Sequence, residues 1–140
     1  GFNFEGAWGV YPYAQSGLVY LSDQDNGLII IEMNDADIYL SGASAVNAGV
    51  TTTLTVNNAQ PNVPWYLLVG FSNAGHTQAG TAIELGSGFS IFANGTTNTA
   101  GSASKSFRVP QAASGRTAYF EVVTLGSTIE SSNLFRLSAL

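Results

Sequence analysis

Hydrophobic positions along this chain alternate with polar ones or gather in short runs, and almost no stretch has the 3.6-residue spacing of a helix. The pattern is plainest in residues 18–31, where the runs LVYLS and LIII flank the polar tip DQDNG. That tip ends in Asn26-Gly27, a dipeptide that readily takes the positive φ of hairpin turns. We therefore predict a β-hairpin at this place.

The pattern continues in strand-sized pieces. Residues 36–42 extend it, and a Gly-marked turn then leads into a Thr-rich strand in which Leu54 and Val56 face inward. Residues 65–71, WYLLVGF, are apolar throughout, which predicts a strand buried on both faces. Further strands are predicted at residues 81–86, 89–93, 105–110, 117–123 and 133–140.

Short strands at roughly 8–12-residue spacing, with turn residues between them, are typical of an antiparallel sandwich. The predicted fold is all-β, an immunoglobulin-like antiparallel β-sandwich with an N-terminal β-hairpin or strand extension. We place the extension at residues 1–40 and the sandwich at residues 41–140.

Composition narrows the choice of cellular location for this protein. The chain has 140 residues, of which 45% are hydrophobic, so it can bury a core. Only 9% are charged, against an average of about 25%. Such a surface suits an extracellular, cell-surface or assembled protein. There is no Cys, so disulfides and a thiolate nucleophile are excluded.

The formal charge is −5, and all four basic residues, Lys105, Arg108, Arg116 and Arg136, come after residue 100. A nucleic-acid surface needs clustered Lys and Arg, so nucleic acid is not an expected partner. The acidic front and basic back favour either head-to-tail contact or an ordinary solvated surface. No apolar run is long enough for a transmembrane segment, and the start at Gly1 without a signal sequence is typical of a processed chain or a fragment.

The front of the chain resembles the closing repeat of secreted bacterial β-propellers of the LVIVD-repeat, choice-of-anchor type. The resemblance covers about a fifth of the chain. Its matched positions are Trp8, Gly9, Val10, Tyr11, Pro12, Ser16, Gly17, Ser22, Asp23, Gly27 and Leu28.

The remainder resembles a C-terminal β-sandwich module found on secreted and surface proteins of planctomycetes and similar bacteria. The positions that carry this looser pattern are Thr53, Leu54, Thr55, Val56, Pro61, Val109, Pro110, Gly115, Tyr119, Ser132 and Asn133. Together the resemblances imply the tail of a larger exported protein. A blade without its siblings has uncovered strand edges, which must be covered either by the chain's own sandwich or by another molecule.

This leads to our first functional hypothesis, a structural subunit that forms a homo-oligomer or polymer by strand addition. The front segment is aromatic and nearly uncharged, so it can serve as a donated strand in the next subunit. Alternatively, residues 1–14 form a strand of the same chain's own sheet. The candidate assembly residues are Phe2, Phe4, Trp8, Val10 and Tyr11.

Carboxylates with a spacing of two residues raise the possibility of a Ca²⁺ site, because hard oxygen ligands suit this ion. The candidates are Asp23, Asp25, Asp35 and Asp37. However, DQDNG is too short for an EF-hand loop, so ordinary turn chemistry is the competing interpretation.

Catalytic motifs are lacking. His76 is the only histidine, it lies in a loop-like stretch expected to be exposed, and no G-x-S-x-G accompanies it. We therefore predict a protein without enzymatic activity and without a cofactor other than a possible Ca²⁺.

The aromatic residues suggest an alternative function, a carbohydrate- or cell-surface-binding module at the end of a larger secreted protein. Trp65 begins the most apolar strand and is predicted to belong to the core rather than to a binding platform. Asn94 begins the glycosylation sequon N-G-T in a predicted loop.

Overall fold

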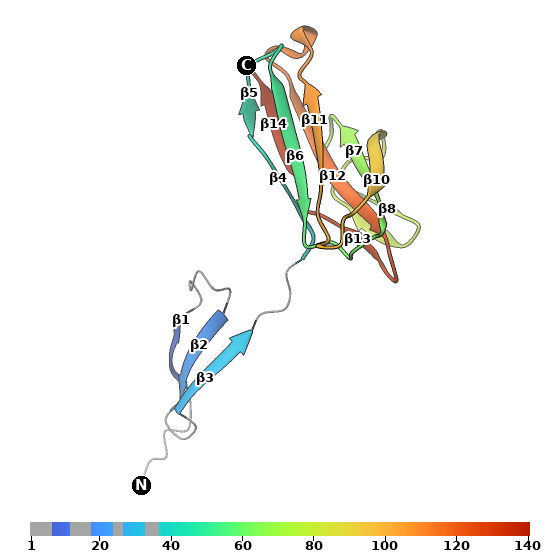
Figure 1. Ribbon diagram of the computed structural model, residues 1–140. Coiled ribbons are helices and arrows are strands. Elements are labelled where there is room, and N and C mark those ends of the chain that lie inside the picture. Colours follow the sequence, from blue (N-terminus) through green and yellow to red (C-terminus); the bar gives the residue numbers. More distant parts are fainter. Residues whose placement is uncertain (1–6, 12–17, 24–26, 33–36) are drawn as a thin grey trace. The chain divides into compact units, whose positions relative to one another are not determined.

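The computed structural model describes the backbone of residues 7–11, 18–23, 27–32 and 37–140, and the side chains from residue 37 onward (Figure 1). The chain divides into two compact units, Gly1–Ala36 and Asp37–Leu140, which are described separately. The sequence placed the division at residue 40. In the structure Ile38 and Leu40 are buried in the sandwich core, so residues 37–40 belong to the second unit.

The first unit contains a three-stranded antiparallel sheet in the order β1-β2-β3. Its strands are β1 (Ala7–Tyr11), β2 (Leu18–Asp23) and β3 (Gly27–Glu32). Strands β2 and β3 pair from Leu18 opposite Glu32 to Asp23 opposite Gly27, which confirms the predicted hairpin. Strand β1 pairs with β2 of its own chain, and its other edge is the edge of the described sheet.

The second unit is the predicted β-sandwich. Its elements are β4 (Tyr39–Ser41), β5 (Ala45–Val46), β6 (Thr51–Asn57), β7 (Pro64–Gly70), β8 (His76–Gln78), β9 (Thr81–Ile83), β10 (Ser90–Thr96), β11 (Ala103–Arg108), the 3-10 turn η1 (Gln111–Ala113), β12 (Thr117–Leu125), β13 (Ile129–Ser131) and β14 (Phe135–Ala139).

One sheet has the order β11-β6-β4, and the larger one runs β10-β7-β12-β14-β5, with β13 paired to β12. All pairs are antiparallel except β5 and β14, which run parallel. The fold class expected from the strand spacing is therefore confirmed, with this one parallel pair in addition.

Alternation decides which side chains fill the space between the sheets. Along β6, Thr52, Leu54 and Val56 are buried while Thr51 and Thr53 are exposed, as a period of two requires. Leu54 and Val56 belong to the main core cluster, as predicted.

Strand β7 is buried on both faces, which confirms the expectation from its continuous apolar run. Trp65 and Leu67 face the main core, and Leu68 on the opposite face packs with Ile83 and Leu85. The hairpin β8–β9, with the residues that follow it, therefore covers the outer face of the large sheet.

The chain enters the sandwich at one end, and the C-terminal strand and η1 lie near the other. Tyr39, just after the beginning of the unit at Asp37, pairs with Asn57 at the end of β6. At the other end of β6, Thr51 pairs with Arg108, close to η1 and the C-terminal strand (Figure 1). A seven-residue strand spans roughly 20 Å. The chain thus enters the sandwich at the end opposite to Arg108.

Candidate functional site

Strand β10 is a long, uncharged edge of the large sheet. It pairs with β7 on one side only, and of its residues only Ala93 is even half-buried. Ile91 is 58% exposed. The register shifts between Ile91 and Ala93, so Phe92 lies at a β-bulge. Asn94 lies in this strand, paired with Tyr66, and not in the loop that the sequence predicted.

Other long edges carry charges, which are a common protection against edge-to-edge pairing. The described edge strands of five or more residues are β1, β3, β10 and β11. Strand β11 carries Lys105 and Arg108, and β3 ends in Glu32. Strands β1 and β10 contain no charged residue. These two strands therefore lack the protection that charged side chains give, although each has a register shift against its neighbour.

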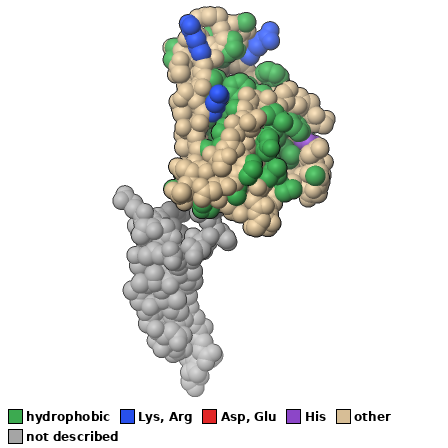
Figure 2. Space-filling view, turned by 45° about the vertical axis from the view of Figure 1, so that its right-hand side comes forward, with side chains coloured by type: hydrophobic (Ala, Val, Ile, Leu, Met, Phe, Trp, Pro, Cys, Tyr) green, Lys and Arg blue, Asp and Glu red, His purple; other side chains and the backbone are tan. Residues whose placement is uncertain are grey.

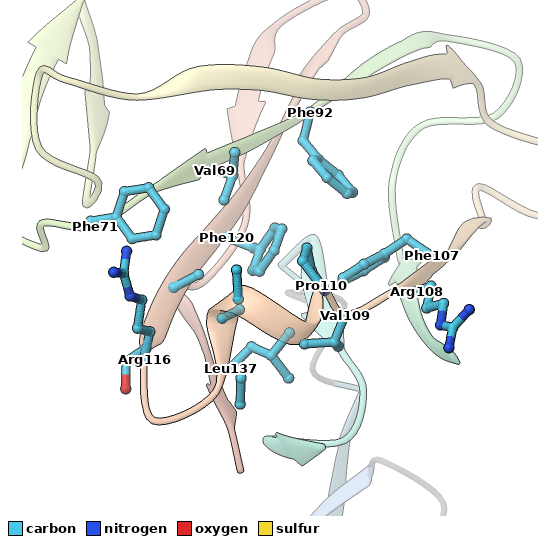
Figure 3. Close-up of a pocket in the computed structure, with 15 residues that line it drawn as sticks. Val69, Phe71, Phe92, Phe107, Arg108, Val109, Pro110, Arg116, Phe120 and Leu137 are labelled. Atoms are coloured by element: carbon cyan, nitrogen blue, oxygen red, sulfur yellow. The ribbon is translucent and has the colours of Figure 1, made fainter. Parts of the chain in front are cut away.

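Next to the beginning of β10, an apolar pocket of about 400 Å³ opens into the sandwich (Figure 3). Its wall includes an aromatic cluster in which the ring of Phe92 lies 4.9 Å from that of Phe107 and 5.6 Å from that of Phe120. Phe92 and Phe120 come from the large sheet, on β10 and β12, and Phe107 comes from β11 of the small sheet, so both sheets contribute to the pocket wall.

The mouth of the pocket is positively charged. Among its lining residues the only charged side chains are Arg108 and Arg116. Arg108 is held in place, since its Nε donates a hydrogen bond of 2.6 Å to the carbonyl of Gly49. Arg116 lies beside Phe71 at the opposite side of the mouth (Figure 3), and Phe71 is 76% exposed. Figure 2 shows hydrophobic side chains gathered on the surface of this unit, with Lys and Arg on the same face.

A second polar arrangement lies on the outer face of the large sheet, around the fully buried Glu121 of β12. Its Oε2 accepts hydrogen bonds from the backbone N–H groups of Glu84, at 2.9 Å, and Leu85, at 3.0 Å. Its Oε1 has no hydrogen-bond partner. Burial raises the pKa of this carboxyl, although the two N–H donors act in the opposite direction. Glu121 therefore ties the segment after β9 to the sheet.

His76 lies beside this carboxyl in strand β8 and is half-buried, so the expectation of an exposed loop histidine was wrong. Its Nδ1 lies 2.7 Å from the carbonyl oxygen of Leu85, and its ring stacks on Phe89 at 5.2 Å. Its Nε2 has no partner, so no serine hydroxyl of the described residues is bound to it. In this arrangement His76 serves to pack the hairpin.

Sequence reasoning missed both Glu121 and the pocket. A lone carboxylate inside the apolar run YFEVV was the available signal for Glu121. For the pocket, Phe92, Phe107 and Phe120 come from three separate strands, and no local pattern indicates that they meet.

The predicted metal ligands are only partly placed. Asp23 ends β2, Asp37 is exposed at the beginning of the sandwich unit, and Asp25 and Asp35 lie outside the described residues. Within the described ranges no group of three or more His, Cys, Asp or Glu could hold a metal ion. The Ca²⁺ site stays a prediction.

The predicted assembly residues are also divided. Trp8, Val10 and Tyr11 lie in β1, whereas Phe2 and Phe4 lie outside the described residues. Trp65 is only 6% exposed, which confirms its predicted place in the core.

No known protein family, no curated protein and no solved structure matches this chain. The resemblances drawn from the sequence therefore stay predictions. In the part of the chain that the structure describes, no helix has the length and apolar character needed to cross a membrane.

Proposed function

We propose that this chain is a non-enzymatic extracellular structural subunit that assembles into a filament or another polymer by β-strand addition between neighbouring chains. The observation that carries this proposal is the pair of uncharged edge strands, β1 in one unit and β10 in the other. In the assembly, β1 of one chain pairs with β10 of the next.

The unpaired edge of β10 favours such a contact physically. Each edge strand offers a row of backbone N–H and C=O groups, and a second edge strand can satisfy them. Backbone bonds provide affinity, and side chains at alternate positions set the register. Strand β1 can supply this partner without leaving β2, because each strand has two edges.

Composition supports the same proposal. Because only 9% of the residues in the chain are charged, its surface repels a second copy only weakly. The alternative, a carbohydrate- or cell-surface-binding module, requires an exposed aromatic platform. Trp65 is buried and cannot provide one, so this function would depend on exposed rings such as that of Phe71.

A charge on β10 tests the proposal. We expect Ile91→Lys to raise the lowest concentration at which polymer forms by about tenfold or more, because the charge blocks edge pairing. Since Ile91 is exposed, the free energy of unfolding should change by no more than about 0.5 kcal/mol. Light scattering of a dilution series, with electron microscopy, measures the polymer.

Ile129→Lys is the matched control, because Ile129 is 47% exposed and lies on β13. It should leave the polymer-forming concentration unchanged. A wild-type chain that stays monomeric at every concentration, or equal effects of the two lysines, would refute strand addition at β10. Binding to insoluble polysaccharides by such a monomer would then favour the alternative function.

A further inference from the structure

The apolar pocket beside β10 is large enough to accept aromatic side chains. Building on the proposed function, we infer that it receives the aromatic side chains of Phe2 and Phe4 from a second copy of this chain, with Glu5 of that copy next to Arg116. The contact is head-to-tail.

Apolar chemistry is the first support. The pocket wall is made of aliphatic and aromatic side chains, among them the rings of Phe92, Phe107 and Phe120. Aromatic rings gain from packing edge-to-face against other rings, in addition to the area that they bury. Residues 1–6, GFNFEG, supply two phenylalanines at positions two apart, which lie on the same face of an extended chain.

Charge complementarity is the second support. Glu5 is the only charged residue in the first fourteen, and the charges of the pocket lining are two arginines and no carboxylate. Of the two, Arg108 already donates to Gly49, so Arg116 is the better partner for Glu5. An ion pair at a partly exposed rim contributes specificity and register more than affinity.

The third support is that the pocket adjoins β10, and this determines the direction in which β1 of the second copy runs along β10. Phe92 belongs to both the edge strand and the pocket wall. Ser90 pairs with Val69, which also lines the pocket, so β10 begins at the pocket end. If β1 of the second copy lies parallel to β10, Ala7 comes next to Ser90. The residues before Ala7 then reach the pocket, so we infer parallel pairing.

The two ends of the sandwich explain why the donor is a second copy. The front unit joins the sandwich at Asp37, at the end where Tyr39 pairs with Asn57. The pocket lies at the other end, where Arg108 pairs with Thr51. A donor attached at one end and an acceptor at the other form a heterologous contact, which repeats into an open polymer when the rotation does not close.

A charge exchange on the full chain tests the inference. Glu5→Lys and Arg116→Glu should each raise the lowest polymer-forming concentration, roughly two- to fivefold, and the double variant should restore it. Lys105→Glu is the matched control, because Lys105 lies on β11 outside the pocket lining. It should neither weaken assembly nor rescue Glu5→Lys.

Filling the pocket provides a second, independent variant. Ala112 is exposed and lines the pocket, so Ala112→Trp should occupy the space without disturbing the core. We expect the polymer-forming concentration to rise about tenfold to a hundredfold, as for loss of a buried Phe, at an unchanged melting temperature.

The outcomes separate this inference from the proposed function. If Ile91→Lys weakens the polymer while Ala112→Trp and the charge exchange have no effect, strand addition stands and the pocket inference is wrong. If the pocket variants weaken assembly but Glu5→Lys does not, the pocket binds something other than this segment, an apolar anion for example, and the inference is overturned. A wild-type chain that never assembles overturns both.

Discussion

At the scale of single residues, Glu121 is the most informative side chain of the sandwich. An ionised carboxylate in an apolar environment is costly, and here two backbone N–H groups compensate for only part of that cost. Burial therefore raises the pKa of Glu121 above its ordinary value of 4.5. The folded chain holds this proton more tightly than the unfolded chain does.

The sign of the pH effect follows from this shift. The stabilising contribution of the protonated carboxyl is fully present below pH 4.5 and is lost as the pH rises through the raised pKa. In Glu121→Gln the side chain stays neutral and its carbonyl oxygen still accepts both N–H bonds. We expect this variant to gain stability relative to the wild type as the pH increases from about 4 to about 8.

Urea denaturation across that pH range measures the difference. Glu130→Gln on β13 removes an equal charge from a half-buried position and serves as the control. If the free energies of unfolding of the wild type and of Glu121→Gln change equally with pH, the raised pKa of Glu121 is contradicted.

Residue-level packing also explains a prediction that failed. Asn94-Gly95 is a typical turn dipeptide, yet both residues lie inside β10. A Cβ on Gly95 would lie 3.0 Å from the ring of Trp65, a tighter contact than most Cβ atoms make, so the close approach of this strand to the tryptophan favours glycine. The tertiary contact decides the conformation here, and the local sequence does not contain that information.

At the scale of elements, the burial of the interior strands could be predicted, whereas the choice of strands that form the edges of the sheets could not. Residue alternation in β6 and the continuous apolar run of β7 reflect burial directly, so their place in the core could be predicted. The hairpin β8–β9 has a mixed polar sequence, and only its packing on Leu68 gives it a role. Edge positions depend on which strands pair, and composition alone does not determine pairing.

Replacing isoleucine by alanine should affect stability differently in the β8–β9 hairpin, which covers the large sheet, and in the edge strand β10. Ile83→Ala should lower the free energy of unfolding by roughly 2–4 kcal/mol, because Ile83 is buried against Leu68 and Leu85. Ile91→Ala on β10 should change it by no more than about 0.5 kcal/mol. Chemical denaturation measures both free energies of unfolding. Equal decreases for the two variants would contradict a buried Ile83 and an exposed Ile91.

At the scale of the whole molecule, the sandwich unit has its own core. Among the side chains that the structure describes, which begin at residue 37, two clusters of buried hydrophobic residues lie within this unit. We expect residues 37–140 to fold alone, with a melting temperature within a few degrees of that of the full chain. Circular dichroism measures this, and a broad, non-cooperative melt would show that the front unit is needed for folding.

The same truncated chain should remain monomeric under conditions in which the full chain assembles, because it lacks β1. The candidate site could be predicted only in part for a related reason. An aromatic, nearly uncharged front segment was visible in the sequence, whereas its proposed acceptor forms only when β10, β11 and β12 are folded together.

The parallel pair β5–β14 has a mechanical consequence. Ala45 lies opposite Ser138 and Val46 opposite Ala139, and the backbone N–H of Ala48 donates a further hydrogen bond to the carbonyl of Leu140. Tension applied between Asp37 and the pocket end acts along β4 and β5, so the hydrogen bonds to β6 and β14 are loaded together in shear rather than opened one by one. In the proposed polymer, a sandwich fastened in this way would resist extension at β4, its first strand, where a fibre under load would otherwise begin to unfold.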